Sequence, residues 1–139
     1  MRKVALLFLA FVPAFMFGAV TIPAGTEVVI DENNLSDYSQ GIVFADNSAV
    51  VRFNLQSAPG MPIAGGGTIV KVSDTDWTMT TSIPDFTGDY ILAGSGVVSA
   101  GIVEAFGKSG DKTYAHSLTV SNGCTLAVTH DVKYLLGYR

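Results

Sequence analysis

Two aspartates separated by one residue stand next to the only tryptophan of the chain. Asp74-Thr75-Asp76 precedes Trp77, and paired carboxylates can bind a hard cation through their oxygens. Calcium takes about six to eight such ligands, and neither an EF-hand loop nor a Gly-Gly-x-Gly-x-Asp pattern accompanies this pair. We therefore expect a solvated turn that leads into a strand at Trp77, with no metal and no other cofactor.

Trp77 and Tyr90 are the candidate ligand-binding residues. Both side chains join an apolar ring to a polar tip, so an exposed ring could form a flat face on which a sugar stacks. A core or edge position for Trp77 is the competing expectation, and the exposure of the ring distinguishes the two.

Asp85 and Asp89 flank a turn and could form the carboxylate pair of a glycosidase, which needs a separation of about 5–9.5 Å across a cleft. No second acid is placed opposite them by the sequence. Asp37 and Asp85 precede an aromatic residue in similar segments, which favours a turn role, because Asp side chains accept hydrogen bonds from nearby backbone amides. We predict no catalytic residue and no enzyme activity.

Cys124 is the only cysteine, and His116 and His130 lie on either side of it. Zinc sites use tighter ligand spacing, and no local pattern of a catalytic cysteine surrounds Cys124. Gly65-Gly66-Gly67 precedes a strand and lacks the Gly-Lys-Ser/Thr ending of a phosphate loop. These residues therefore predict neither a metal site nor a nucleotide site, and Cys124 is expected to be a small buried residue.

The composition restricts the class of protein. Charged residues make up 14% of the 139 residues, the net charge is −4, and there are 15 glycines. A nucleic-acid binder needs a cationic face to displace counterions, so we exclude nucleic acid as a partner. Few charges together with many Val, Thr and Ser residues favour strands and turns over helices.

The N-terminus has the pattern of a secretory signal peptide. Residues 1–3 form a short cationic region, and Val4–Phe17 follows as an apolar run. This run is shorter than the ~20 residues of a transmembrane helix but suits a signal peptide. We predict that residues 1–19 direct export and that residues 20–139 form one domain at the cell surface, associated with the outer membrane or extracellular. An uncleaved N-terminal anchor is the alternative.

Short strand patterns separated by turn residues fill the rest of the chain, and no apolar 3.6-residue period persists there. This arrangement is typical of an all-β sandwich, barrel or solenoid. The predicted strands are Thr26–Ile30, Gly41–Ala45, Ala49–Phe53, Thr68–Val72, Trp77–Thr80, Asp89–Leu92, Gly96–Ser99, Gly101–Phe106, Ser117–Val120 and Thr125–Thr129.

Internal similarity favours the solenoid. Residues 35–50 match residues 83–98 without gaps, and a third copy begins 28 residues after the second. The first spacing, 48 residues, leaves room for two units. The equivalent positions are Asp37 with Asp85, and Tyr38 with Phe86 and Tyr114.

A unit of this kind cannot bury its apolar side alone, whereas stacked units give each strand backbone partners above and below. We therefore predict an all-β parallel β-helix, or β-solenoid, of about 4–6 rungs, with the three aromatic side chains in one column. Glycine is expected at the corners, where a positive φ or a close approach is required, namely at Gly41, Gly88, Gly96 and Gly123.

Residues 85–98 (Asp-Phe-Thr-Gly-Asp-Tyr-Ile-Leu-Ala-Gly-Ser-Gly-Val-Val) resemble the autotransporter-associated β-strand repeat. Gly65–Val72 is similar to the Gly-rich strand that opens such repeats, and Ser117–Leu126 to their closing strand–Asn-Gly–strand element. The resemblance covers about half of the chain, mainly residues 65–128. It implies a right-handed parallel β-helix of a surface passenger, although the sequence lacks the membrane barrel usual at the C-terminus of that family.

The leading expectation for function is an exported structural or adhesin-like solenoid that presents a rigid repeat surface to other molecules. Surface glycans or molecules of a host or neighbouring cell are the expected partners. Open sheet edges favour weak homo-association unless they are capped, for which Asp31–Asn34 and Lys133 are the candidates. The alternatives are a carbohydrate-binding β-sandwich module and a fragment of a β-helix polysaccharide-degrading enzyme.

Overall fold

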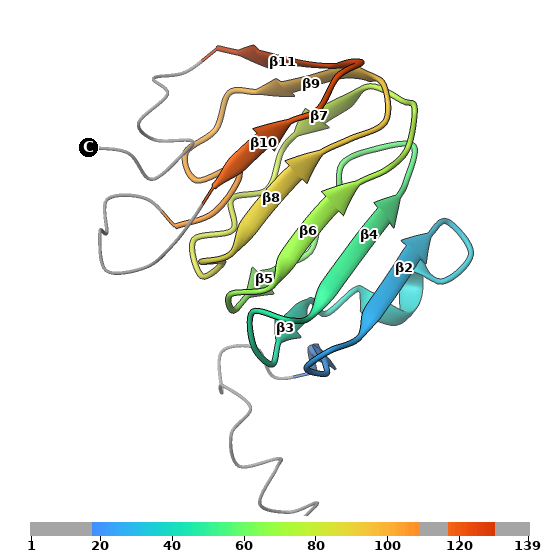
Figure 1. Ribbon diagram of the computed structural model, residues 1–139, viewed down its shortest axis with the longest axis vertical. Coiled ribbons are helices and arrows are strands. Elements are labelled where there is room, and N and C mark those ends of the chain that lie inside the picture. Colours follow the sequence, from blue (N-terminus) through green and yellow to red (C-terminus); the bar gives the residue numbers. More distant parts are fainter. Residues whose placement is uncertain (1–17, 109–116, 130–139) are drawn as a thin grey trace, which may run out of the picture.

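The computed structural model describes residues 18–108 and 117–129 (Figure 1). Most of the predicted signal peptide lies outside these residues. The described chain is mainly strand and turn, with a short 3₁₀ helix, η2 (Leu35–Tyr38). The strands are β1 (Val20–Ile22), β2 (Glu27–Asp31), β3 (Ile42–Phe44), β4 (Val50–Asn54), β5 (Ile63–Ala64), β6 (Thr68–Lys71), β7 (Trp77–Met79), β8 (Asp89–Leu92), β9 (Gly96–Ala100), β10 (Leu118–Val120) and β11 (Cys124–Val128).

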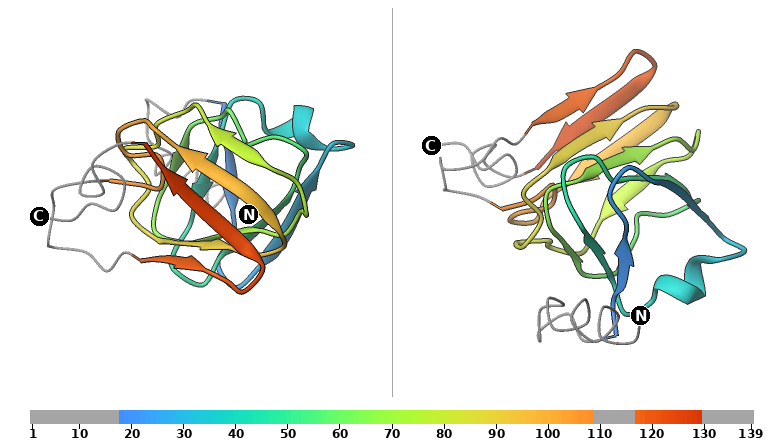
Figure 2. Two further views of the ribbon diagram at one scale, coloured as in Figure 1. Left: turned by 90° about the horizontal axis from the view of Figure 1, so that it is seen from above. Right: turned by 60° about the horizontal axis from the view of Figure 1, so that its bottom comes forward.

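The strands form three parallel sheets. The first sheet has the order β1-β3-β5, the central sheet β10-β8-β6-β4-β2 and the third sheet β11-β9-β7. Successive passes of the chain stack as coils of a β-solenoid of about 4 turns, as Figure 2 shows. The predicted all-β solenoid is confirmed. The β-sandwich alternative is wrong, because sandwiches pair their strands antiparallel, whereas the strands described here pair in parallel.

The pairing register confirms one predicted spacing and corrects the other. Ser117 lies 28 residues after Asp89 and donates a hydrogen bond to it, as the second spacing predicted. The 48-residue spacing is wrong. Ala64 is the last residue of β5 that pairs with β3, so the next residue, Gly65, lies one coil above Phe44. Gly65 in turn bridges Phe86, which therefore lies two coils above Phe44. Loops of unequal length between the coils cause this difference, which an ungapped comparison cannot detect.

Tyr38 is therefore not equivalent to Phe86. Tyr38 lies in η2, outside the strands, and Tyr114 lies outside the described residues. The predicted single column of Tyr38, Phe86 and Tyr114 is replaced by a cluster in which neighbouring ring centroids lie at distances suited to edge and tilted contacts. The distances are 5.8 Å for Phe44–Phe86, 6.2 Å for Phe86–Tyr90 and 5.1 Å for Tyr90–Phe106.

Alternate residues of the central sheet point into the solenoid and stack in ladders, because side chains along a strand alternate between its two faces. Ile30, Phe53, Lys71, Leu92 and Val120 form one inward ladder by their register. The first four of these side chains are fully buried, while Val120 is 41% exposed. A second inward ladder consists of Val28, Val51, Ile69, Tyr90 and Leu118.

Two of the predicted corner glycines show why glycine is needed. Gly96 has a φ of +95°, and a Cβ there would meet the backbone of Thr75 in the coil below. A Cβ at Gly88 would clash with the carbonyl oxygen of Gly67, so its role is the close approach of two coils. Gly41 and Gly123 also have positive φ, of 105° and 98°.

Three strand predictions need correction. The short strands β1 and β5 were not expected, and they form the first sheet with β3. Gly101–Phe106, predicted as a strand, is a turn segment in which Ala105 and Phe106 are fully buried. Its Glu104 carbonyl oxygen accepts a hydrogen bond from the Ile83 amide at 3.0 Å. The apolar residues of this segment therefore serve to close the side of a coil and not to extend a sheet.

Candidate functional site

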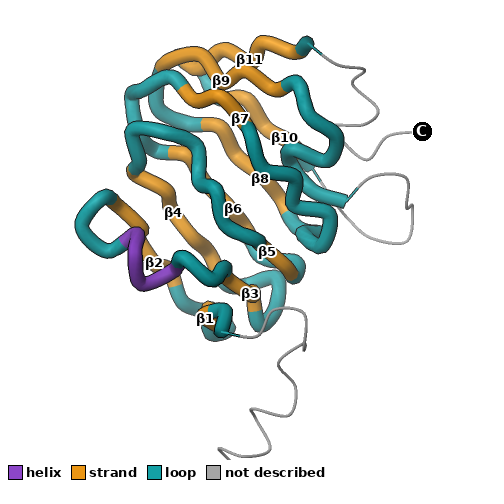
Figure 3. Tube along the Cα trace, turned by 180° about the vertical axis from the view of Figure 1, so that it is seen from behind, coloured by secondary structure: helices purple, strands orange, loops and turns teal. Residues whose placement is uncertain are grey.

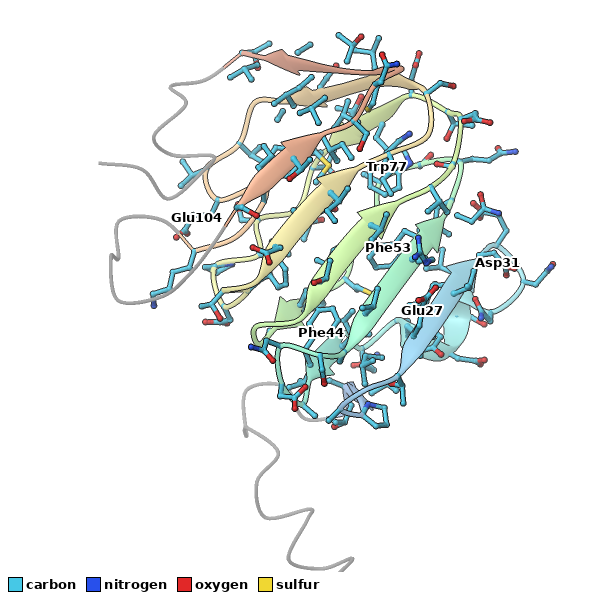
Figure 4. The ribbon with its side chains drawn as sticks, in the orientation of Figure 1. Glu27, Asp31, Phe44, Phe53, Trp77 and Glu104 are labelled. Carbon is cyan, nitrogen blue, oxygen red and sulfur yellow. The ribbon has the colours of Figure 1, made fainter. Side chains whose placement is uncertain are left out.

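The outer face of the central sheet is a regular surface made by the residues that alternate with the inward ladders. Its middle row, by register, runs from β2 to β10. In Figure 4, Glu27 and Asp31 mark the β2 end of this sheet. On β4, β6 and β8 the inward neighbours of this row are fully buried, so the backbone that carries the middle of the surface is held from beneath. The row consists of Val29, Arg52, Val70, Ile91 and Thr119.

Polar side chains on this outer face link one coil to the next. Arg52 Nε donates to Glu27 Oε2, and the two side chains are 41% and 51% exposed. At the other end of the sheet, Ser117 Oγ donates to Asp89 Oδ1 at 2.8 Å. Between them lie Val70, which is only 6% exposed, and Ile91, whereas Val29 at the β2 edge is 49% exposed. The face therefore offers aliphatic contact area next to charges of both signs.

A hydrogen-bonded turn follows β2. Asp31 Oδ1 accepts hydrogen bonds from the amides of Asn33 and Asn34, at 2.9 and 3.3 Å, and Asn34 Oδ1 accepts from the Asp31 amide at 2.8 Å. The turn leads directly into η2, which lies next to β2 in Figure 3 and from which Leu35 and Tyr38 pack against the core. This is the place where the sequence predicted a cap.

Trp77 and Tyr90 lie in the core and not on the surface. They are 1% and 0% exposed, so neither ring presents a face to a ligand from solvent. Trp77 Nε1 donates to the Leu55 carbonyl oxygen at 3.1 Å. Burial raises the pKa of the Tyr90 phenol, and its hydroxyl has no hydrogen bond within the described part of the chain.

Lys71 is a buried polar residue that the sequence analysis missed. It is fully buried on the inward ladder, where its Nζ donates to the carbonyl oxygens of Ser73 and Ser95 at 2.6 and 2.8 Å. The Nζ also lies 5.5 Å from the centre of the Trp77 ring. The alternation of side chains along a strand could have predicted this position, because it places Lys71 on the same face as Ile69.

The candidate acids are distributed along the solenoid. Asp76 Oδ1 accepts a hydrogen bond from the Val97 amide at 2.8 Å and so joins two coils. No side-chain hydrogen bond of Asp37 or Asp85 occurs within the described residues, and the predicted kind of turn bond is made instead by Asp31 and Asp46. The hydrogen bonds from Ser48 lower the pKa of the Asp46 carboxyl.

Among residues 18–108 and 117–129, no three His, Cys, Asp or Glu side chains are grouped closely enough to hold a metal ion. His116 and His130 lie outside those ranges. Cys124 is half-buried at the start of β11, where it pairs with Gly96. It therefore occupies the outermost described coil and not the middle of the core.

No helix within the described residues is long and apolar enough to cross a membrane. Comparisons with models of known protein families, with curated proteins and with solved structures gave no match for this chain.

Proposed function

We propose that this protein is an exported, non-enzymatic structural or adhesin-like solenoid that presents the outer face of its central sheet to other molecules. The observation that carries the proposal lies on β2 and β4, where Ile30 and Phe53 are fully buried on the inner face while Val29, Arg52 and Glu27 are about half exposed on the outer face. A surface held in this way loses little conformational entropy on binding, which favours recognition of large or repetitive partners.

The export part of the proposal depends on residues 1–19, whose cationic and apolar segments have the order of a signal peptide. The proposed surface location, at the outer membrane or outside the cell, requires this export as its first step. The resemblance of residues 65–128 to autotransporter-associated repeats supports the same location, because that repeat belongs to surface passengers. The proposed partners are surface glycans or molecules of a host or neighbouring cell.

Export is tested by expressing the full chain in a Gram-negative host and separating the cell fractions. Intact-mass measurement is expected to find a chain that lacks about the first nineteen residues, in the periplasmic, surface or medium fraction. An unprocessed chain in the cytoplasm would contradict the export proposal. An Arg2→Glu/Lys3→Glu variant is the control, since it removes the cationic region and is expected to block processing.

Binding by the central sheet is tested with two matched valine variants. Val29 and Val97 are 49% and 39% exposed, on the outer faces of the central and the third sheet. The purified chain is applied to a glycan array and to whole bacterial and host cells. Val29→Glu is expected to reduce retention, whereas Val97→Glu is expected to leave it unchanged. Equal effects of the two variants, or no retention of the unmodified chain, would contradict the proposed binding face.

A further inference from the structure

β2 is the edge strand of the central sheet at the first end of the solenoid (Figure 1). The backbone groups along a strand point alternately toward its two sides. The Val50 amide of β4 donates to the Thr26 carbonyl oxygen at 2.9 Å, so the even-numbered residues of this segment face β4. The backbone N–H and C=O groups of Glu27, Val29 and Asp31 therefore face the outer edge, where a further parallel strand could pair.

The side chain of Asn34 occupies part of this edge. Its Nδ2 donates to the Val29 carbonyl oxygen at 2.9 Å, and its Oδ1 accepts from the Asp31 amide at 2.8 Å. In a parallel ladder, one residue of the neighbouring strand donates to a carbonyl oxygen and accepts from the amide two positions further along. The Asn34 carboxamide therefore makes the two bonds that a residue opposite Ile30 would make in an additional coil.

The turn between β2 and η2 holds Asn34 in this position. The Asn34 amide donates to the Asp31 carbonyl oxygen at 3.3 Å, and the Asn33 amide donates to Asp31 Oδ1 at 2.9 Å. Leu35 follows as the first residue of η2 and packs against the core. Because these contacts already fix the backbone, the carboxamide loses little additional conformational entropy when it binds the edge.

We propose that Asn34 is an edge cap, which closes residues 29–31 of β2 to strand addition and so ends the central sheet at this coil. The apolar cover of this end is incomplete, since Val20 and Val28 are half-buried. An edge with free backbone groups beside such side chains is a template for pairing with another chain. The chain that Asn34 excludes is a second copy of this protein, because two identical open edges can pair with each other about a two-fold axis.

Hydrogen exchange in the unmodified chain, followed by NMR, gives the first test. The Asp31 amide should exchange more slowly than the Val29 amide after correction for their intrinsic rates, because both face the edge and the described residues provide an acceptor only for Asp31. Equal protection of the two amides would overturn the proposal, and this comparison does not depend on the folding of any variant.

Asn34→Ala and Asn33→Ala are matched variants, since each removes one carboxamide from the same turn. Asn34→Ala removes the acceptor of the Asp31 amide and should speed its exchange about fivefold or more relative to the Phe53 amide of β4, the factor expected for the loss of one hydrogen bond. Asn33→Ala should leave this ratio unchanged, because Asn33 contributes its backbone amide to the turn. An unchanged ratio in Asn34→Ala, or equal changes in the two variants, would overturn the proposal.

Sedimentation velocity separates edge capping from a purely structural role. Asn34→Ala should dimerise at a concentration about tenfold or more below that of the unmodified chain, the change that ~1.4 kcal/mol of added association free energy produces. Asn33→Ala should associate as the unmodified chain does. An Asn34→Ala variant that remains as monomeric as Asn33→Ala would mean that Asn34 only stabilises the turn, which also overturns the proposal.

Discussion

The described chain covers the two ends of the solenoid to different degrees. At the first end, the inward-facing Ile22 and Ile30 are buried as completely as residues in the middle of the stack, while Val20 and Val28 are half-buried. The turn after β2 leads into η2, and Leu35 and Tyr38 pack against the core there. At the other end, Val120 and Val128 continue the inward ladders but remain more than one-third exposed.

In a solenoid, the stability of a coil depends on the cover that it receives on both of its sides. Interior coils receive cover from their neighbours, and each end needs a segment that is not itself a coil. The first end obtains that segment locally, within a few residues of β2. Within the described residues the last coil has no such segment over Val120 and Val128, so the two ends should respond differently to the same kind of substitution.

Truncation of inward-facing residues at the two ends is expected to give the largest contrast. Ile30→Ala should destabilise the protein by about 2–5 kcal/mol, because it leaves a cavity in a fully buried site. Val120→Ala should cost less than about 1 kcal/mol if water already reaches the site, as its exposure indicates. Urea unfolding followed by circular dichroism measures both values.

Two outcomes would contradict this contrast. A cost for Val120→Ala as large as that for Ile30→Ala would mean that the last coil is covered in solution. A cost for Ile30→Ala below ~1 kcal/mol would contradict the closed state of the first end.

Lys71 extends the comparison of the two ends to an interior coil, because it lies on the same inward ladder as Ile30 and Val120. Lys71→Ala should cost about 3 kcal/mol or more, since it leaves a cavity and removes the donor of two buried carbonyl oxygens. Lys71→Met fills the cavity and removes a buried charge, so it should cost at least ~1 kcal/mol less. Urea midpoints of the two variants test this order, and the reverse order would mean that the ammonium group contributes more than packing.

The sequence predicted the parallel solenoid because its main signals were local and repeated. Short strands, turn residues and the 28-residue spacing all survive in the register of β10 on β8. The spacing of 48 residues failed because the loops that join the coils differ in length, and an aligned aromatic carries no information on loop length. Phe86 consequently stacks above Phe44 and not opposite Tyr38.

The site residues were harder to predict, since their roles depend on which face of the fold they occupy. Trp77 was weighed between a surface platform and the core, and only the coil packing places it over Lys71 and next to Leu55. Lys71 could have been found from strand alternation alone. The turn structure of Gly101–Phe106 could not be predicted, because a run of apolar residues that covers the side of a coil has the same composition as a buried strand.

Tyr90 on β8 tests whether water reaches the coil beneath β10 and β11. Its pKa in the folded state is raised above the ordinary value of 10.0 by burial, so the stability it contributes is complete below pH 10. That stability is lost as the pH rises above 10, because the unfolded chain then ionises first. Urea unfolding from pH 7 to 11 should show a steeper alkaline loss for the unmodified chain than for Tyr90→Phe. Parallel curves would indicate that water reaches the phenol, and that incomplete cover extends one coil beyond β10 and β11.

The polar contacts on the outside of the two ends are expected to have the smallest effects, and to be nearly equal. Arg52 joins the first two coils through Glu27, and Ser117 joins the last two through Asp89. Both contacts are exposed, so Arg52→Met and Ser117→Ala should each change the free energy of unfolding by less than about 0.5 kcal/mol. The Arg52→Met effect should also shrink in 1 M NaCl, where charges are screened within ~3 Å, whereas the Ser117→Ala effect should change less. If Ser117→Ala cost several times more than Arg52→Met, the last coil would depend on its outer contacts for its attachment, as expected of a coil whose inner face has too little cover.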